Sequence, residues 1–342
     1  MKTEYIVLTD GSDEVYERAG QVIREGGLVA FPTETVYGLG GDAYDPSAAE
    51  RIFAAKGRPS DNPLIVHVEK PEDCENFAYT NDTYYKLAEH FMPGPLTVIL
   101  PKKDIIPYSV TGGLETVAVR CPSHPAARRL IRAAGVPIAA PSANVSGKPS
   151  PTEGSHVLAD MDGRISMILD GGESAIGVES TVIRLEDDGC TILRPGEVIA
   201  RELAQVVGNV YVSEAVTDPA AAGENPESPG MKYRHYAPRA RLVLVDGTDE
   251  AFYNYVNNFE GRCAVLEYSE NIGNYISACV LDAGSRESAS QQMHNRFATL
   301  RRCDEIDCEI IFAHLPPKSD EFLALYNRII RAAGNEVIYL GK

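Results

Sequence analysis

Four short segments combine cations, hydroxyls, glycines and prolines in a way that suits ligand binding. They are residues 32–40 (PTETVYGLG), 56–63 (KGRPSDNP), 116–120 (TVAVR) and 141–150 (PSANVSGKPS). In the second, Lys56 and Arg58 lie on either side of a glycine in a proline-stiffened loop, an arrangement that suits phosphate oxygens. In the third, Arg120 ends an apolar strand, where burial without an anion is costly, so a carboxylate is its natural partner.

Each segment also has a purely structural interpretation, and for residues 32–40 it is a polar turn. Lys56 ends a predicted helix and could simply complement the helix dipole. Arg120 could form an internal salt bridge, and Ser142 to Asn144 could be an ordinary capped turn. If the four segments meet, their groups would hold phosphates, a carboxylate and a hydroxylated ligand, and no activated nucleophile is evident. The residues alone therefore predict a site that binds a nucleotide and a small carboxylate, and that acts by positioning and charge neutralisation.

Several better-known motifs fail in this sequence. Residues 38–43 fit G-x-G-x-x-A but do not open a helix directly, so this short match does not predict dinucleotide binding. Residues 147–148 lack the upstream glycine and the following hydroxyl of a phosphate-binding Walker loop. There is no H-E-x-x-H, no G-x-S-x-G and no metal-spaced histidine pair. Metal, hydride and serine-nucleophile chemistry thus lose their usual sequence support.

These segments lie beside predicted strands, which must position them. Apolar runs predict strands at residues 28–31, 64–68, 96–100, 116–120, 137–140, 165–169, 181–185 and 191–194. Helical periodicity precedes residues 26–27, and Asp45 with Pro46 opens a helix that stops at Gly57. Many strands with few long helices favour a mixed α/β sheet over a simple parallel one.

The composition changes after this region. Residues 213–228 are acidic, contain prolines and a run of alanines, and carry no Lys or Arg, which is typical of a linker. A basic and aromatic cluster follows at residues 231–238 (MKYRHYAP). Strand signals at 242–245, 263–266, 276–281 and 309–313 then alternate with helical stretches near 250–257, 286–301 and 319–333, as in a small Rossmann-like α/β domain. We predict domains at residues 1–210 and 240–342, with an interdomain linker at 211–239.

The bulk composition excludes some classes of protein. The 342 residues are 44% hydrophobic, the ordinary value for a globular chain of about two domains, but the formal net charge is -17. A protein that binds a long nucleic acid usually shows a basic face, so stable nucleic-acid binding is not expected. No apolar run approaches the length of a membrane span, and no signal-peptide pattern occurs at the N-terminus. The seven cysteines include no C-x-x-C and predict free thiols in a reducing cytoplasm.

The motifs, in this order, resemble the threonylcarbamoyl-AMP synthase family, whose catalytic domain is YrdC-like. The family signature is Lys-x-Arg followed later by Ser-x-Asn, here Lys56-Gly57-Arg58 and Ser142-Ala143-Asn144. Residues 32–40 and 177–181 match as well. The resemblance spans the chain and implies the long form, an open twisted mixed sheet with a large cavity plus a small C-terminal Rossmann-like domain. Residues 232–238 look like its linker motif.

The resemblance also implies roles for individual residues. Lys56 and Arg58 would be catalytic, offsetting charge on the phosphates. L-threonine would contact Thr35, His67, Arg120, the backbone of Ala140, and Ser180. ATP would contact Lys56, Arg58, Asn62, Thr116, Ser142, Asn144, Ser150 and Arg194, and Tyr236 from the linker would close over the nucleotide.

The implied enzyme is an L-threonylcarbamoyladenylate synthase, a nucleotidyltransferase. It would make threonylcarbamoyl-AMP and pyrophosphate from L-threonine, bicarbonate and ATP, with Mg²⁺ accompanying ATP on ligands that the sequence does not identify. The product would pass in the cytoplasm to a transferase complex that modifies tRNA at position 37. Two alternatives are a carbamoyl transferase of the hydrogenase-maturation kind, disfavoured by the lack of cysteine clusters, and a non-catalytic RNA-binding factor, disfavoured by acidity.

Overall fold

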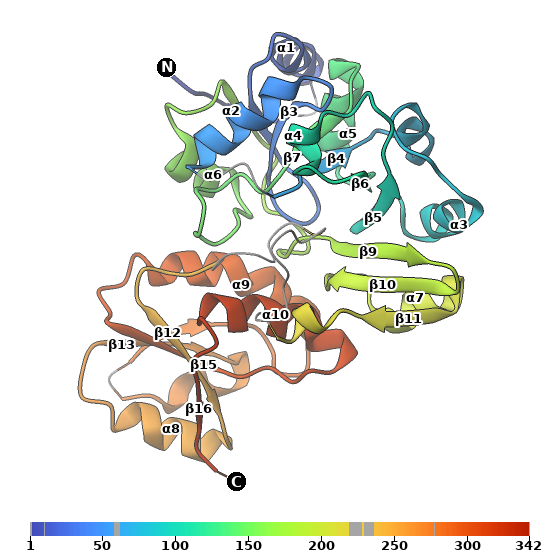
Figure 1. Cartoon of the computed structure of the whole chain (residues 1–342). Coiled ribbons are helices and arrows are strands. Elements are labelled where there is room, and N and C mark those ends of the chain that lie inside the picture. Colours follow the sequence, from blue (N-terminus) through green and yellow to red (C-terminus); the bar gives the residue numbers. More distant parts are fainter. Residues whose placement is uncertain are drawn as a thin grey trace. The chain divides into compact units, whose positions relative to one another are not determined.

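A computed structural model describes residues 2–9, 11–57, 62–218, 228, 236–276 and 278–341. The chain divides into two compact units, one of Met1–Ser146 with Ser150–Lys232 and the other of Gly147–Pro149 with Tyr233–Lys342 (Figure 1). The expected linker at 211–239 lies mostly outside the described residues. One strand, β11 (Asn209–Val212), continues past the boundary predicted at residue 210 and belongs to the first unit.

The first unit is built on one mixed sheet of eleven strands among the described residues. In spatial order the strands are β1 (Glu4–Val7), β8 (Met167–Asp170), β2 (Val29–Phe31), β3 (Gly38–Asp42), β7 (Ile138–Ala140), β4 (Ile65–His67), β6 (Thr116–Arg120), β5 (Leu96–Pro101), β9 (Thr181–Glu186), β10 (Gly189–Arg194) and β11. Parallel and antiparallel pairs alternate irregularly along this order, for example β4 with β6 parallel and β5 with β6 antiparallel. The predicted mixed α/β sheet is confirmed.

Helices lie on both faces of this sheet. They are α1 (Asp13–Arg24), α2 (Pro46–Lys56), α3 (Asp82–Phe91), α4 (Tyr108–Thr111), α5 (Pro125–Ala134), α6 (Gly154–Met161) and α7 (Ala200–Val207), with short 3₁₀ turns at Pro71–Asn76 and Glu214–Val216. As predicted, Asp45 caps α2, accepting a hydrogen bond from the Ser47 N–H, and Gly57 ends it in the left-handed conformation. Helices α3 to α7 were not predicted, although the buried positions of α5 (Ala126, Ala127, Leu130, Ile131 and Ala134) have helical spacing.

Strand alternation separates two cores. Val29 and Phe31 of β2 pack with α1 and α5 on one face, whereas Ala30 between them joins the larger core on the opposite face. The α1 and α5 core extends as far as β7. Beyond it, a smaller cluster of Ile65, Ile99, Ala118 and Val182 continues on the same face across β4, β5, β6 and β9. This half of the face is where the predicted site residues of the central strands lie.

The second unit contains an all-parallel sheet of five strands among its described residues, in the order β14 (Cys279–Asp282), β13 (Cys263–Glu267), β15 (Ile310–His314), β12 (Arg241–Asp246) and β16 (Val337–Tyr339). Its helices are α8 (Asp249–Asn257), α9 (Ala289–Cys303) and α10 (Leu323–Ala332), with 3₁₀ turns at Ser269–Asn274 and Asp320–Phe322. The Rossmann-like expectation is confirmed as a parallel α/β sheet. The strand predicted at 276–281 begins at residue 279, and β16 was not predicted.

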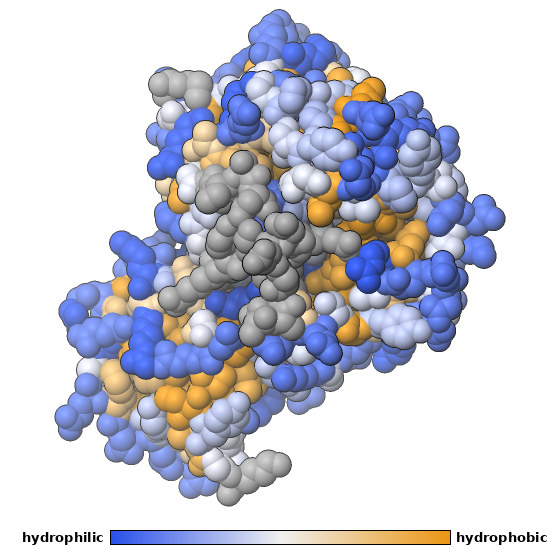
Figure 2. Space-filling view, in the orientation of Figure 1, coloured by the Kyte–Doolittle hydropathy of each residue, from blue (hydrophilic) through white to orange (hydrophobic). Residues whose placement is uncertain are grey.

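Hydrophilic residues dominate the visible face of each unit, with apolar residues scattered among them (Figure 2). Among the described residues, no helix combines the length and the apolar character needed to cross a bilayer.

The close packing around β3 generates a prediction. A Cβ added at Gly40 would lie 2.6 Å from Ile138 Cγ2 and 2.8 Å from Phe31 Cε1, whereas one added at Gly11 would meet nothing within 4 Å. We expect Gly40→Ala to lower the free energy of unfolding by about 1–3 kcal/mol through overpacking, measured by denaturant titration. Gly11→Ala is the control and should change stability by less than about 0.5 kcal/mol; equal effects would contradict the packing argument.

Candidate active site

The first site segment, residues 32–40, is tied by backbone hydrogen bonds to two later segments. Leu39 donates to the Pro141 carbonyl at 2.8 Å, and the Tyr37 carbonyl accepts from Ala143 at 2.9 Å. On its other side, the N–H groups of residues 176 and 177 donate to the carbonyls of Glu34 and Thr35 at 2.8 and 3.1 Å. Segments far apart in the sequence are therefore held side by side, as the predicted site requires.

Lys56 links the two signature motifs. It is the last residue of α2 and only 3% exposed, and its ammonium donates to the carbonyls of Ser142 at 2.5 Å and Asn144 at 2.8 Å. The Ser142 hydroxyl in turn donates to Asn144 Oδ1 at 2.5 Å. The helix-dipole interpretation of Lys56 is thus incomplete, because its charge is directed at the Ser-x-Asn loop. The other signature cation, Arg58, lies outside the described residues.

A row of polar side chains crosses the central strands. His67 of β4 pairs in register with Arg120 of β6, which pairs with Thr97 of β5. Because all three are on the face that carries Ile65 and Ala118, their side chains lie on the same side of the sheet. They are 4%, 4% and 0% exposed. The structure therefore brings His67 and Arg120 together, and adds Thr97, which the sequence did not single out.

Arg120 forms a buried ion pair with Glu34. The Arg120 Nη2 to Glu34 Oε1 distance is 2.8 Å, and the two side chains are 4% and 10% exposed. Arg120 Nε also points to the Gly94 carbonyl at 3.4 Å, while Nη1 makes no hydrogen bond within the described part of the chain. The internal salt bridge considered from the sequence is present, yet Arg120 retains donors for a second carboxylate. The sequence did not predict a role for Glu34, because its partner Arg120 is distant in the chain and becomes its neighbour only in the folded structure.

The electrostatics of this cluster fix its charge states. Burial, reinforced by the positive charge of Arg120, lowers the pKa of His67 to about 3, so the imidazole is neutral near pH 7. Its Nδ1 lies 3.1 Å from the Ile65 carbonyl. Burial by itself raises the pKa of Glu34, but the charge and hydrogen bonding of Arg120 outweigh burial and leave that pKa below its ordinary value. The site therefore holds a carboxylate, a guanidinium and a neutral imidazole.

A second hydrogen-bonded chain adjoins this row. Arg194, 4% exposed, donates from Nε to the Ser180 carbonyl and from Nη2 to the Ser180 hydroxyl, both at 3.1 Å. The Ser180 hydroxyl also lies 2.8 Å from Thr97 Oγ1. Ser150 donates its hydroxyl to the buried Glu179 carboxylate at 2.5 Å. Ser180 and Arg194, assigned to different substrates by the resemblance, are thus direct neighbours.

The remaining predicted residues lie as follows. Thr35 is fully buried, and its hydroxyl lies 2.9 Å from that of Thr33. Asn62 is also fully buried, and neither Nδ2 nor Oδ1 has a partner among the described residues. Thr116 begins β6, and Ala140 ends β7 in the core beside α5. Tyr236 belongs to the second unit, where its buried ring stacks on Phe297 with centroids 5.0 Å apart.

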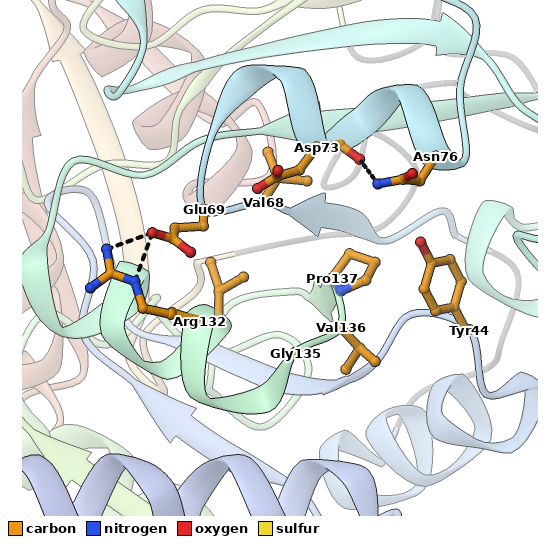
Figure 3. Close-up of a pocket in the computed structure, with 10 residues that line it drawn as sticks. Tyr44, Val68, Glu69, Asp73, Asn76, Arg132, Gly135, Val136 and Pro137 are labelled. Atoms are coloured by element: carbon orange, nitrogen blue, oxygen red, sulfur yellow. Dashed lines mark hydrogen bonds and ion pairs between the residues drawn. The ribbon is translucent and has the colours of Figure 1, made fainter.

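A separate pocket of about 240 Å³ on the first unit does not have the groups expected of a nucleotide site. It is lined by Tyr44, Glu69, Asp73 and Arg132, among others, and by none of the predicted site residues (Figure 3). Arg132 donates from Nε to Glu69 at 2.8 Å, which neutralises its charge. With two carboxylates and one paired cation, this pocket does not suit phosphates.

Similarity to known proteins covers nearly the whole chain. Residues 21–196 match the family described as "Telomere recombination", and residues 198–334 match "Threonylcarbamoyl-AMP synthase, C-terminal domain". A threonylcarbamoyl-AMP synthase of Bacillus subtilis is 43% identical over 99% of this chain and 100% of its own length. A protein of the same name from Pyrococcus abyssi is 43% identical over 94% of both chains.

Solved structures agree with the sequence matches. The structure described as Pyrococcus abyssi Sua5 complexed with L-threonine has a TM-score of 0.90 and 40% identity over 99% of both chains. The fold and site define a two-domain α/β protein with a YrdC-like first domain. The chain belongs to the threonylcarbamoyl-AMP synthase family, in its long form.

The buried ion pair generates a prediction for stability and its pH dependence. We expect Glu34→Gln to lower the free energy of unfolding at pH 7 by about 3–5 kcal/mol, because Arg120 keeps a buried charge without its partner. Since the folded-state pKa of Glu34 lies below 4.5, the pair stabilises the protein above that pH, and the stabilisation is lost as pH falls through the folded-state pKa. The gap between wild type and variant should therefore narrow below pH 4.5, measured by denaturant titration.

The control is Glu17→Gln, at an exposed position of α1. It should leave stability within about 0.5 kcal/mol of wild type. A gap for Glu34→Gln that stays constant from pH 7 to pH 3 would show that packing, rather than charge, is responsible.

Proposed function

We propose that this chain is an L-threonylcarbamoyladenylate synthase, a nucleotidyltransferase that converts L-threonine, bicarbonate and ATP into threonylcarbamoyl-AMP and pyrophosphate. The observation that carries the proposal is the buried polar row of His67, Arg120 and Thr97, with Ser180 beside Thr97. These groups suit the carboxylate, hydroxyl and amine of an amino acid. The related Pyrococcus structure described as complexed with L-threonine adds support.

L-threonine would bind across this row. The donors on Nη1 of Arg120 suit the substrate carboxylate, while Glu34 keeps the guanidinium in place. Neutral His67 can exchange hydrogen bonds with the substrate without adding positive charge, so it does not favour a second anion. Hydroxyls of Thr35 and Ser180 and the backbone of Ala140 complete the proposed threonine contacts.

ATP would occupy the neighbouring part of the site. Lys56 and Arg58 suit the phosphates. The amide of Asn62, which has no hydrogen-bond partner among the described residues, can donate to and accept from a ligand. The remaining proposed ATP contacts are Thr116, Ser142, Asn144, Ser150, Arg194 and Tyr236. Because Lys56 already holds the Ser142 and Asn144 carbonyls, its loss would disturb both the phosphate charge balance and the shape of this loop.

The proposed chemistry needs no protein nucleophile. Bicarbonate releases CO₂ and hydroxide, and the neutral amine of threonine forms a C–N bond with the CO₂. The amine proton combines with the hydroxide to give water, which leaves a carbamate. A carbamate oxygen then attacks the α-phosphorus of ATP, and the bond to pyrophosphate breaks. Lys56 and Arg58 would offset the charge that develops on the phosphates. Burial of the polar row limits water, which protects the labile carbamate.

Mg²⁺ is proposed to accompany ATP. Within the described ranges, no group of three or more His, Cys, Asp or Glu side chains is arranged to hold a metal ion. Mg²⁺ is commonly held by substrate phosphates with few protein ligands, so this arrangement is compatible with a phosphate-bound ion. The ion would supply further neutralisation of phosphate charge.

The product would serve tRNA modification in the cytoplasm, with transfer of the threonylcarbamoyl group to the adenosine at position 37 by a separate transferase complex. The net charge of -17 disfavours a stable complex of this chain with tRNA. Salt-dependent tRNA binding without ATP turnover would instead favour the RNA-binding alternative.

The charge at the signature motif yields the main test. We expect Lys56→Met to reduce threonine- and bicarbonate-dependent pyrophosphate release at least about a hundredfold, because one preorganised cation is removed. Arg58→Met should act similarly. Products are identified by mass spectrometry with and without L-threonine.

The matched control is Lys86→Met, at an exposed position of α3, which should retain wild-type rates. Thermal unfolding checks that each variant is folded. ATP hydrolysis that is indifferent to threonine, or no turnover by folded wild-type protein, would overturn the proposed function.

Tyr236 gives a separate test. If its ring closes over the nucleotide during turnover, Tyr236→Ala should raise the KM for ATP about tenfold or more, whereas Tyr236→Phe, which keeps the ring, should stay within about threefold of wild type. Steady-state kinetics with varied ATP measures both. An unchanged rate and KM for Tyr236→Ala would contradict a role for this ring at the nucleotide.

A further inference from the structure

The second unit contains a cavity at the carboxyl ends of its parallel strands. Its volume is about 520 Å³, within the usual range for small-molecule sites. The wall includes Val245 and Asp246 from the end of β12, Tyr268 just after β13, and His314 at the end of β15. None of these residues takes part in the proposed synthase chemistry.

The topology of the sheet favours ligand binding at this place. Strands β12 and β15 are neighbours, but the chain leaves them in opposite directions: β12 leads through α8 to β13, and β15 leads through α10 to β16 on the far side of β12. In open parallel sheets, such a switch point leaves a crevice outside the strand ends, where ligands bind. The cavity lies at that crevice (Figure 1 labels β12, β13 and β15).

His314, which lines the cavity, is oriented by a buried carboxylate behind it. Glu267 is 0% exposed, and its Oε1 and Oε2 lie 3.1 and 3.2 Å from His314 Nε2. Glu267 also accepts hydrogen bonds from the Tyr275 hydroxyl and the Tyr268 N–H. The His314 ring is stacked between Phe252 and Tyr268, with centroids 3.8 and 4.7 Å away. Such fixation of a polar side chain is typical of a preorganised binding site.

Cations and aromatic rings supply the chemistry of recognition. Arg286 lies with its guanidinium carbon 4.5 Å from the Tyr268 ring centroid, held by an ion pair with Asp249. Lys318 lies at the exposed rim, 4.9 Å from the Tyr326 ring centroid, and has no ion pair within the described part of the unit. These cations suit an anionic group, and the aromatic rings suit a planar group. The combination favours a ligand that contains both.

Two polar groups in this part of the unit have no hydrogen-bond partner among the described residues. The Tyr268 hydroxyl makes no hydrogen bond to any residue that the structure describes. Arg296 of α9 is only 4% exposed, and its Nε likewise has no partner there. Arg296 lies on the same helix face as Gln292, which donates to the carbonyls of Ser285 and Arg286 beside the cavity.

We propose that the second unit carries its own binding site for a small phosphorylated compound with a flat ring, of about the size of a mononucleotide. The phosphate would be bound by Lys318 and Arg286, and the ring would lie against the aromatic side chains of the cavity. The site is separate from the one proposed for catalysis and makes or breaks no covalent bond. It gives the C-terminal domain a ligand-sensing role.

The test is calorimetric titration of the full chain with AMP. Lys56→Met serves as the background, because it weakens nucleotide binding at the proposed catalytic site and leaves the second unit intact. The Lys56→Met protein should still bind AMP. Adding Lys318→Met should lower the affinity for AMP about tenfold or more. Adenosine and inorganic phosphate, each lacking half of the recognised chemistry, should each bind at least about tenfold more weakly than AMP.

Adding Lys86→Met in place of Lys318→Met is the matched control and should leave AMP affinity unchanged. The proposal is overturned if the Lys56→Met protein does not bind AMP, or if the Lys318 and Lys86 variants bind it equally well. This experiment measures AMP binding to a protein that lacks Lys56, not catalysis. A wild-type protein that released no pyrophosphate with threonine would therefore not change the AMP-binding result. The two proposals can therefore fail independently.

Discussion

The buried ion pair of Glu34 and Arg120 is the constraint on which the proposed site depends. It joins the loop after β2 to the end of β6 at a place where both side chains are almost fully shielded from water. Removing two charges from water is costly unless they pair well. Replacing either residue with a neutral one would therefore leave the other as a buried charge without its partner. The pair fixes the guanidinium across from His67, and the fixed positive charge helps to keep that imidazole neutral. A substrate carboxylate would then meet a cation that is already oriented.

Lys56 has a comparable role for the signature motifs. Its ammonium holds the carbonyls of Ser142 and Asn144, and the N–H of Ser146 donates back to the Lys56 carbonyl at 3.0 Å. The motif that ends α2 and the loop that follows β7 thus form one structure before any nucleotide binds. This preorganisation reduces the entropy lost on binding, which is the main contribution available to a site without a nucleophile.

The second unit has polar side chains arranged for binding at the carboxyl ends of its parallel strands. Its cavity lies where the strand connections run in opposite directions, and His314 of the cavity wall is held there by stacking on Phe252 and by the buried Glu267 carboxylate. Nothing in the proposed synthase reaction uses these groups. A ligand site in this unit would give the long form of the family a property that the first unit alone lacks.

The class of fold and most strands could be predicted from the sequence, because short apolar runs depend only on residues that are neighbours in the chain. It also identified Lys56, Arg120 and Ser142 as ligand-binding candidates, since their types and neighbours are informative. It could not find Glu34 or Thr97, whose significance comes from partners distant in the chain: Arg120 across the sheet and Ser180 at 2.8 Å. Only tertiary structure decides such pairings, because register and strand order place residues side by side that no local pattern connects.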